Sequence, residues 1–503
     1  MLSEKHKGYI KDLVFISFPT CLFFLFLWIR TLVNIAFISN TYSDYRLIEA
    51  LGLTDLYINC STYIVLVGIS GGVEILGSNF YGDKNYYFLG VIVLRAKFIA
   101  LSYYVFITIF NYFFAIRIIV FLFNVEEEVI HMMKPYFYTT MIYMFLQIFL
   151  NIDFRYLSII GKSYINTVIL FLTMCLHPIV NYILITKLDL NLLGCGISNL
   201  FIQLISTLGL IIYIKIYDPL PGSYISINSD CFKGWGQYLK ICMPTTLMLL
   251  GEWMGFELQA LIVMHFSALD YTVHIIFINL QLMLFTFTLS INISMSINVA
   301  QKVVAYSKKN LIEFIKICYI VNKIGILILI FILFLFKEKI LFNLTTGLEM
   351  KRIADDTISI IYLYLFLDNG YFFFGGVLKG LAYLILPAVI TFINFYVLQI
   401  SLSYYFCLYL GLGVKGIWMS LTIGTSFSYF SFYILLRNLN IDKMRMEACE
   451  RINEYRNERK SSRKLSNMDI PLLKGKNYIE MNDFENGFNF NAKRSSRLYN
   501  DEF

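Results

Sequence analysis

Apolar residues gather in long continuous runs along this chain, and short polar stretches separate them. Each run has roughly 20 residues, the length that a helix needs to cross a hydrocarbon core about 30 Å thick. The runs lack the strict alternation of apolar and polar residues that a membrane β-barrel needs. The pattern predicts membrane-spanning helices at 13–38, 56–78, 98–123, 136–157, 164–186, 193–216, 239–266, 272–299, 311–336, 357–379, 382–409 and 414–436.

Composition agrees with a membrane protein and excludes other classes. Only 15% of the 503 residues are charged, against about 25% in soluble domains. The nine cysteines form no Cys-x-x-Cys pair, so we expect free thiols and no metal site. The five histidines form no catalytic or metal-ligand pattern, which argues against a membrane-embedded enzyme, and no basic stripe suits nucleic acid.

Positive charge is distributed unevenly among the loops. An even number of spans places both termini on one side, and the loops on that side carry most of the Lys and Arg residues. Because such loops usually face the cytoplasm, both termini are predicted to be cytoplasmic. We expect a multi-pass protein of the plasma membrane or of a vacuolar or endosomal membrane, working as a monomer. The residues behind this orientation are Lys5, Lys7, Lys11, Lys84, Arg95, Lys97, Arg155, Lys162, Lys215, Lys233, Lys240, Lys302, Lys308, Lys309 and Lys316.

Two stretches of the chain resemble each other about 225 residues apart. YIKDLVFISFPTCLFFLFLW begins at Tyr9, WGQYLKICMPTTLMLLGEW begins at Trp235, and Pro19 and Pro244 occupy matching places. A weaker pair is HPIVNYILI in the fifth span and PAVITFINFYVL in the eleventh. Six helices separate the copies, so the halves should be related by a pseudo-two-fold axis along the membrane normal, with the substrate cleft between them.

This repeat sets the expected domain organisation. The residues after 437 are rich in Arg, Lys, Asn, Ser and Glu, which predicts a basic and mostly disordered tail after a short amphipathic start. The chain should therefore contain a cytoplasmic N-terminus (1–12), an N-terminal six-helix bundle (13–218), a cytoplasmic linker (219–238), a C-terminal six-helix bundle (239–436) and a disordered cytoplasmic tail (437–503).

Three carboxylates lie deep inside the predicted spans: Glu252 and Glu257 in the seventh, and Asp368 in the tenth. Ionisable residues at such depth are costly and usually face a cavity or a partner. Glu252 and Glu257 are separated by about 7.5 Å along the helix axis and about 140° around it. They cannot share one narrow face of the helix, but both can border a wide cleft.

Buried carboxylates of this kind suggest an exchange mechanism. Desolvation favours the protonated form of a carboxyl group, so it can exchange protons near neutral pH. If a cationic substrate competes for the same group, proton entry and substrate release become coupled. The nearby aromatic residues Trp253, Phe256, Tyr371 and Phe372 could hold an organic cation by cation–π contact.

The other charged or polar residues in the spans favour structural roles. Asp153 and Arg155 are predicted to form a local ion pair near the cytoplasmic end of their helix. Glu74 is expected to reach the headgroups, and Arg30 to extend outward to the membrane surface. His177 is expected to be a packing residue.

These residues carry a resemblance to a known family. The run from Pro244 to Leu249 leads into Glu252-Trp253 and Phe256-Glu257, and Asp368 lies seven positions before the segment Gly-Gly-Val-Leu-Lys-Gly at 375–380. The stretch 75–96 and the pair at 181–182 add to the match. In these features the chain resembles the eukaryotic branch of the multidrug and toxic compound extrusion (MATE) family, over roughly residues 9–436.

The resemblance implies export of organic cations or other xenobiotics in exchange for protons, through two six-helix bundles and without a bound cofactor. It implies that Glu252, Glu257 and Asp368 are the proton or cation coupling sites. It also implies that Asn181 is a polar residue of the substrate cavity, to which we also assign Trp253, Phe256, Asn279 and Tyr371. Asn279 stands where some members have an acid, which leaves the stoichiometry open, and glycines usual near 300–306 are replaced here.

Two alternatives remain open from the sequence. Sodium could replace the proton, because carboxylates, Asn side chains and backbone carbonyls bind either. A flippase or exporter for a lipid-linked or amphipathic substrate could use a related two-bundle fold. Such a cavity would favour Lys and Arg in its walls for phosphate, whereas the deep charges here are mainly carboxylates.

Overall fold

The computed structural model describes residues 4–44, 46–123, 125–344 and 348–468, and those residues form helices joined by short connections. Twelve of the described helical spans are long and apolar enough to cross a membrane, which confirms the predicted all-α, twelve-span fold. The first half comprises α1 (Glu4–Thr41), the composite span α2 (Arg46–Ile58), η1 (Asn59–Tyr63), α3 (Ile64–Gly72), η2 (Val73–Gly77) and α4 (Ser78–Gly82), then α5 (Tyr86–Phe123), α6 (Glu127–Ile159), α7 (Ser163–Asn181) with η3 (Tyr182–Lys187), and α8 (Asn191–Tyr217).

The second half repeats this order. It comprises α9 (Trp235–Phe266), α10 (Ala268–Ala305), α11 (Lys308–Leu335), α13 (Leu348–Gly380), the composite span α14 (Ile385–Phe392), η5 (Ile393–Gln399), α15 (Ile400–Tyr404) and η6 (Tyr405–Tyr409), and α16 (Gly413–Asn438). Three shorter or peripheral helices are η4 (Ser229–Phe232), α12 (Lys337–Leu344) and α17 (Ile441–Met468).

Several helices extend beyond the apolar runs that predicted them. The second, third and fourth spans begin at Arg46, Tyr86 and Glu127, well before the predicted starts. A helix of 38 residues, such as α5, is about 57 Å long, whereas the hydrocarbon core is about 30 Å thick. In α5 the charged residues Arg95 and Lys97 interrupt the apolar run, so hydropathy alone does not locate the turns before them.

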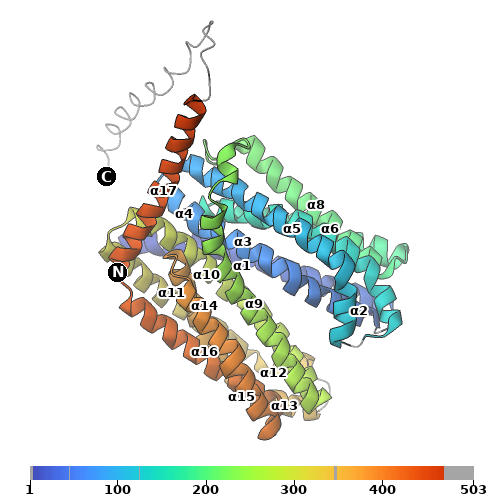
Figure 1. Cartoon of the computed structure of the whole chain (residues 1–503). Coiled ribbons are helices and arrows are strands. Elements are labelled where there is room, and N and C mark those ends of the chain that lie inside the picture. Colours follow the sequence, from blue (N-terminus) through green and yellow to red (C-terminus); the bar gives the residue numbers. More distant parts are fainter. Residues whose placement is uncertain (1–3, 45, 124, 345–347, 469–503) are drawn as a thin grey trace. The chain divides into compact units, whose positions relative to one another are not determined.

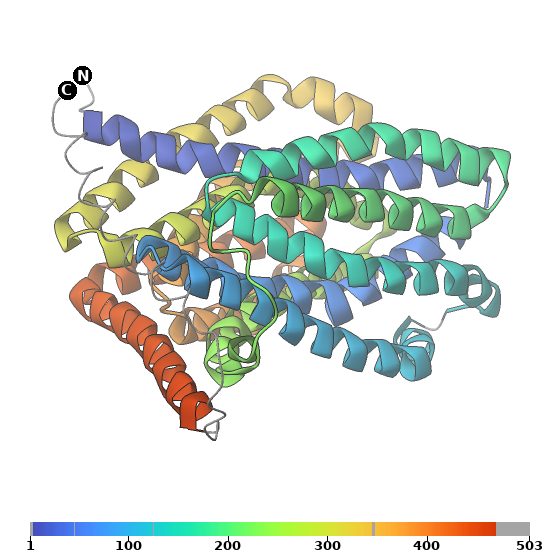
Figure 2. The same cartoon turned by 90° about the horizontal axis from the view of Figure 1, so that it is seen from above.

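The helices form two bundles (Figure 1). Helices α1 to α8, blue to green, lie together, and α9 to α16, green to orange, lie together; Figure 2 shows from above how the long helices run alongside one another. Equivalent pairs of helices pack in each bundle. The contact of α1 with α7 in the first bundle corresponds to that of α9 with α14 in the second, and the contact of α6 with α8 corresponds to that of α13 with α16. Wide π-turns, η3 and η5, follow Pro178 and Pro387 at matching places. The internal repeat is therefore present in the fold.

The bundles meet mainly through α1 against α10 and α3 against α9. These pairs combine the first span with the eighth and the second with the seventh, as a two-fold relation requires. We call the membrane face where α1 begins the amino-terminal side. The two bundles diverge away from that side (Figure 1).

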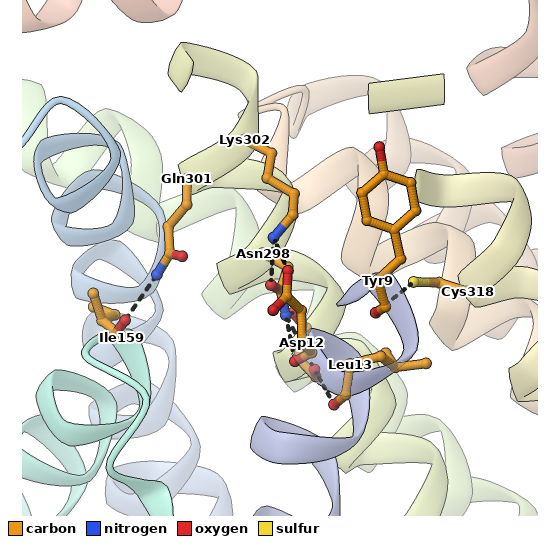
Figure 3. A network of polar contacts seen from close by, with 9 residues as sticks. Tyr9, Asp12, Leu13, Ile159, Asn298, Gln301, Lys302 and Cys318 are labelled. Atoms are coloured by element: carbon orange, nitrogen blue, oxygen red, sulfur yellow. Dashed lines mark hydrogen bonds and ion pairs between the residues drawn. The ribbon is translucent and has the colours of Figure 1, made fainter. Parts of the chain in front are cut away.

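Polar contacts join the bundles at the amino-terminal side (Figure 3). The Asn298 Nδ2 of α10 donates to the Asp12 carbonyl at 3.2 Å, and the Lys302 ammonium lies 2.8 Å from the Asp12 carboxylate. Gln301 donates to the Ile159 carbonyl at 2.8 Å. These contacts close the space between the bundles on this side.

Gly68 allows α3 and α9 to approach closely at the same interface. A Cβ atom at Gly68 would lie 2.1 Å from the Thr246 Oγ1 and 2.7 Å from the Thr246 Cα. Because a backbone atom cannot rotate away, the Gly68→Ala variant should force α3 and α9 apart. Such overpacking costs about 1–3 kcal/mol.

We therefore expect Gly68→Ala to lower the apparent melting temperature, measured by size-exclusion chromatography of heated protein in detergent. Gly52→Ala is the matched control, because nothing lies within 4 Å of a Cβ atom there. Both variants gain the same helix propensity of about 0.5–1 kcal/mol. Equal melting temperatures for the two variants would contradict a close contact at Gly68.

The segment after residue 437 differs from the predicted disorder. Helix α17 begins at Ile441, and Ile441, Met444 and Ala448 are buried in a core cluster with residues of α10, α11, α13 and α16. Their spacing places them on one helical face, which fits the expected amphipathic start, but the helix continues to Met468. Lys308 and Asp442 form an ion pair at 2.7 Å. The rest of the predicted tail, 469–503, lies outside the described residues.

Candidate functional site

Three carboxylates line one cavity within the second bundle. We call it the carboxylate cavity: it is bordered by α9, α10, α13 and η5, and its wall includes Glu252, Glu257 and Asp368. Its empty volume, including its open mouth, is about 810 Å³. Pockets for drug-sized molecules span about 300–1,000 Å³. Glu252 and Glu257, although on different faces of α9, thus border one space.

Gly255 of α9 allows this helix to pack closely beside the carboxylate cavity. A Cβ atom at Gly255 would lie 2.7 Å from the Phe395 ring, so only glycine permits the close packing of α9 on η5. The neighbouring Phe256 ring lies 5.9 Å from the Phe395 ring. With Gly255 turned to η5, the two glutamates flanking it in sequence point toward the cavity.

The carboxylates differ in their access to the outside. Glu252 and Asp368 are 6% and 5% exposed, whereas Glu257 is an exposed residue of the cavity wall. The Tyr364 hydroxyl donates to the Asp368 Oδ1 at 3.3 Å. Glu252 and Asp368 line the same cavity. Two buried carboxylates that interact do not both stay charged unless a proton or cation joins them.

Aromatic rings complete the wall. Trp253, Phe256, Phe285 and Phe372 line the cavity, with the last two rings in edge-to-face contact at 4.9 Å. Aromatic faces attract cations within about 6 Å of the ring centroid. The cavity therefore combines three carboxyl groups with aromatic surfaces.

A second cavity lies between the two bundles, and we call it the central cavity. Glu252 and Tyr371 line it, together with Arg155 and Lys379. The Tyr371 hydroxyl lies 3.1 Å from the Thr391 hydroxyl. Glu252 therefore borders both cavities.

Glu74 forms a buried ionic triad at the central cavity. Glu74 is 0% exposed, and its carboxylate lies 2.7 Å from the Arg155 Nη1 and 3.0 Å from the Lys379 Nζ. Glu74 and Arg155 belong to the first bundle and Lys379 to the second. Glu74 does not reach the headgroups, so that expectation was wrong.

The predicted pair of Asp153 and Arg155 was also wrong. Asp153 lies 2.6 Å from the Lys97 ammonium, and Arg155 turns to Glu74 instead. Residues two apart on a helix do not face each other, so the two charged side chains pair with different neighbours.

Arg30 is held inside the first bundle and does not extend to the surface as expected. Its guanidinium donates to the Gln203 Oε1 at 3.2 Å and to the Tyr143 hydroxyl, and lies 4.9 Å from the Tyr143 ring centroid. These partners provide the stabilisation that water would otherwise supply. His177 is fully buried among the helices, as a packing residue would be.

Two of the predicted cavity residues lie elsewhere. Asn181 is fully buried and donates to the Asn34 Oδ1 at 3.0 Å, and Asn34 donates to Asn199 at the same distance. Asn279 lines neither cavity: its side chain is exposed and donates to the Ile275 carbonyl at 2.9 Å. The structure thus places neither residue in the wall of the two cavities described, and their part in substrate binding stays a prediction.

The buried amide chain has a counterpart in the second bundle. Gln259 donates to Gln399 at 3.1 Å, and Gln399 donates to Asn394 at 3.3 Å. Each chain joins the first span of its half to the fifth, next to the π-turn of that span. The two amide chains thus support the same helix pair in both halves.

Three polar residues inside the helical bundles were not among the residues predicted from the sequence. Gln281, 4% exposed, lines the carboxylate cavity in place of Asn279. Asp55 accepts from the Tyr136 hydroxyl at 2.9 Å, but it lies just before the predicted start of its helix. Lys323 lies in the middle of an apolar run. A charged residue at such a position could have been recognised from the sequence as a candidate functional residue.

Comparisons with known proteins identify relatives of this chain. The chain is 26% identical over 253 residues to Protein DETOXIFICATION 49 of Arabidopsis thaliana, an alignment that spans 50% of each chain. It is 21% identical over 436 residues to Multidrug and toxin extrusion protein 1 of Homo sapiens, covering 84% of this chain and 74% of the human one.

Solved structures share the fold at low sequence identity. The eukaryotic MATE transporter AtDTX14 superposes with a TM-score of 0.83 at 16% identity, covering 89% of this chain and 100% of that one. An outward-facing multidrug resistance MATE family transporter superposes with a TM-score of 0.74 at 14% identity, covering 87% and 96% of the two chains.

The family model MatE matches residues 19–183 and 244–405, one segment in each bundle. These segments include the buried ionic triad and all three carboxylates of the cavity. The chain therefore belongs to the MatE family of multi-pass membrane transporters.

Proposed function

We propose that the protein exports organic cations in exchange for protons. The observation that carries this proposal is the carboxylate cavity, where Glu252, Glu257 and Asp368 meet among aromatic rings. Fixed carboxylates attract a cation, and the rings favour one with an apolar surface. The name of the human relative, a multidrug and toxin extrusion protein, agrees with a substrate of this kind.

The exchange follows from competition for the same carboxylates. A cation bound beside Glu252 and Asp368 balances their charges. When protons arrive instead, the carboxyl groups become neutral and the cation loses its ionic partner, so it leaves. Glu257, at the exposed part of the wall, lies on the route between the buried pair and the outside.

The closed amino-terminal side supports the view that this structure is the state in which the transporter releases its substrate. That side carries the Lys- and Arg-rich loops, so we assign it to the cytoplasm. Contacts such as Lys302 with Asp12 close it, and the bundles diverge toward the opposite side. In this arrangement substrate would leave away from the cytoplasm, and protons would enter from there.

Arg155 and Lys379 line the central cavity, but their pairing with Glu74 argues against a flippase for phosphate-bearing lipids. Arg155 and Lys379 both lie at ion-pair distance from Glu74, which already balances part of their charge. A phosphate would have to compete with that fully buried carboxylate. Cation export remains the function that the cavity chemistry favours.

Transport by purified protein in proteoliposomes tests the proposal. With an acidic interior, ethidium should accumulate against its gradient, because protons leave as the cation enters. A sodium gradient without a pH gradient should drive no accumulation. Accumulation driven by sodium alone would refute proton coupling, and no accumulation with either gradient would refute cation antiport.

A further inference from the structure

A lysine lies inside the membrane-spanning part of α11. Lys323 is only 9% exposed, and apolar residues follow it for several turns. A buried ammonium group in a membrane helix is costly, so its retention usually has a functional reason. The proposed exchange mechanism does not use it.

Lys323 is held against the backbone of α13. Its Nζ donates to the Phe366 carbonyl oxygen at 2.8 Å. Three rings surround the ammonium, with centroids at 4.0 Å for Phe366, 5.3 Å for Tyr429 and 5.7 Å for Tyr319. The aromatic faces replace part of the lost hydration.

The ammonium contacts the helical turn that carries Asp368. It bonds to Phe366 on one side of Asp368, and a Cβ atom added at Gly370, on the other side, would lie 2.7 Å from the Nζ. Glycine at position 370 therefore leaves the space that the lysine occupies. The Lys323 ammonium thus lies beside the turn of α13 that carries the Asp368 carboxylate, near enough for one charge to affect the other.

Neighbouring contacts keep the lysine in this place. Asn322 and Asn369 exchange amide hydrogen bonds at 2.8 and 3.1 Å. The Tyr319 and Tyr429 hydroxyls lie 2.7 Å apart. Helix α11 is thus fixed on α13, and Lys323 is absent from the wall of the carboxylate cavity. Its ammonium therefore lies behind the binding surface, at the turn of α13 that carries Asp368.

We propose that Lys323 is a permanent counter-cation for Asp368, and that it weakens the binding of organic cations enough for them to be released. This inference rests on the proposed function. A fixed positive charge behind Asp368 reduces the attraction of the cavity for a second cation, and it remains when substrate leaves. Lys323 is a positioning residue for charge and does not touch the substrate.

The test compares ethidium binding to the full-length protein in nanodiscs at one fixed pH. Lys323→Gln removes the charge but keeps a donor for the Phe366 carbonyl. We expect its dissociation constant to fall about tenfold, from the loss of one nearby unit charge. In proteoliposomes the same variant should show a lower KM and a lower maximal rate, because release becomes slow. A merely structural role would weaken binding or leave it unchanged, and either result would overturn the proposal.

Further variants separate charge from packing. Lys316→Met, at an exposed position of the same helix, should bind as the unchanged protein does. Lys323→Arg keeps the charge and should restore the original affinity. In an Asp368→Asn background, Lys323→Gln should tighten binding less than it does in the unchanged protein, since the carboxylate that it would leave without a counter-cation is absent.

The outcomes also distinguish this inference from the function on which it rests. If the unchanged protein binds ethidium and Lys323→Gln does not tighten binding, only the role of Lys323 is refuted. If the unchanged protein binds no cation, the proposed function fails, and this inference fails with it. Lys323→Met, tested by the same binding measurement, replaces the Gln variant if that variant does not fold.

Discussion

Replacing Glu252 by Gln slows proton-driven uptake of ethidium about ten- to a hundredfold, because a charge-assisted contact worth roughly 1.5–3 kcal/mol is lost. Gln has nearly the same shape, so packing in α9 is preserved while the exchangeable proton and the negative charge disappear. Glu252 borders both cavities, so its loss affects substrate on either side of it. The measurement is the initial rate of uptake by proteoliposomes with an acidic interior.

The paired variant is Asp368→Asn, which should reduce uptake to a similar extent. Glu338→Gln serves as the control, because Glu338 is 71% exposed and pairs with Lys351 outside the cavities. Its uptake should equal that of the unchanged protein. Uptake that remains coupled to pH in both Glu252→Gln and Asp368→Asn would remove these two residues from the mechanism.

Replacing Glu74 by Gln should destabilise the protein by roughly 3–5 kcal/mol, since removal of one partner leaves buried charge uncompensated. Arg155 and Lys379 would then lie together with no carboxylate between them. The triad joins the two bundles, so its loss should also weaken closure at the amino-terminal side. The apparent melting temperature in detergent reports the first effect.

Asp442→Asn is the control for Glu74→Gln. It breaks the pair with Lys308, in which both side chains are about half exposed, and such surface pairs contribute about 0–1 kcal/mol. Replacing Lys379 by Met together with Glu74→Gln should recover part of the stability, because one of the unpaired charges is removed. If Glu74→Gln has the same apparent melting temperature as Asp442→Asn, that result would contradict the role of the triad.

The sequence predicted the parts of this structure that depend on local hydrophobicity. The apolar runs predicted twelve spans, and the stretches around Pro19 and Pro244 predicted the repeat. Glu252, Glu257 and Asp368 were noticeable because charge is rare in such runs. Their meeting in one cavity fits the expectation of a wide cleft, while their role in coupling stays a prediction.

Other features depend on how separate helices are rotated against each other. Gln281 and Asn279 are two residues apart on α10, yet only Gln281 faces the cavity. The partners of Glu74 come from α6 and α13, and no local pattern connects them. Asn181 was assigned to a cavity from resemblance, whereas the packing of the first bundle encloses it completely.

The closure between the bundles has a consequence for how this protein can vary. Several of its hydrogen bonds end on main-chain carbonyls: Tyr238 donates to Ile69, Ser294 to Leu13, and Gln301 to Ile159. Every amino acid supplies that acceptor, so positions 13, 69 and 159 can change without loss of the bond. For the hydrogen bonds themselves only the donor positions are constrained, whereas Leu13, Ile69 and Ile159 are constrained by the packing of their buried side chains. Selection should therefore preserve a polar donor on one side of this contact and only an apolar side chain of suitable size on the other.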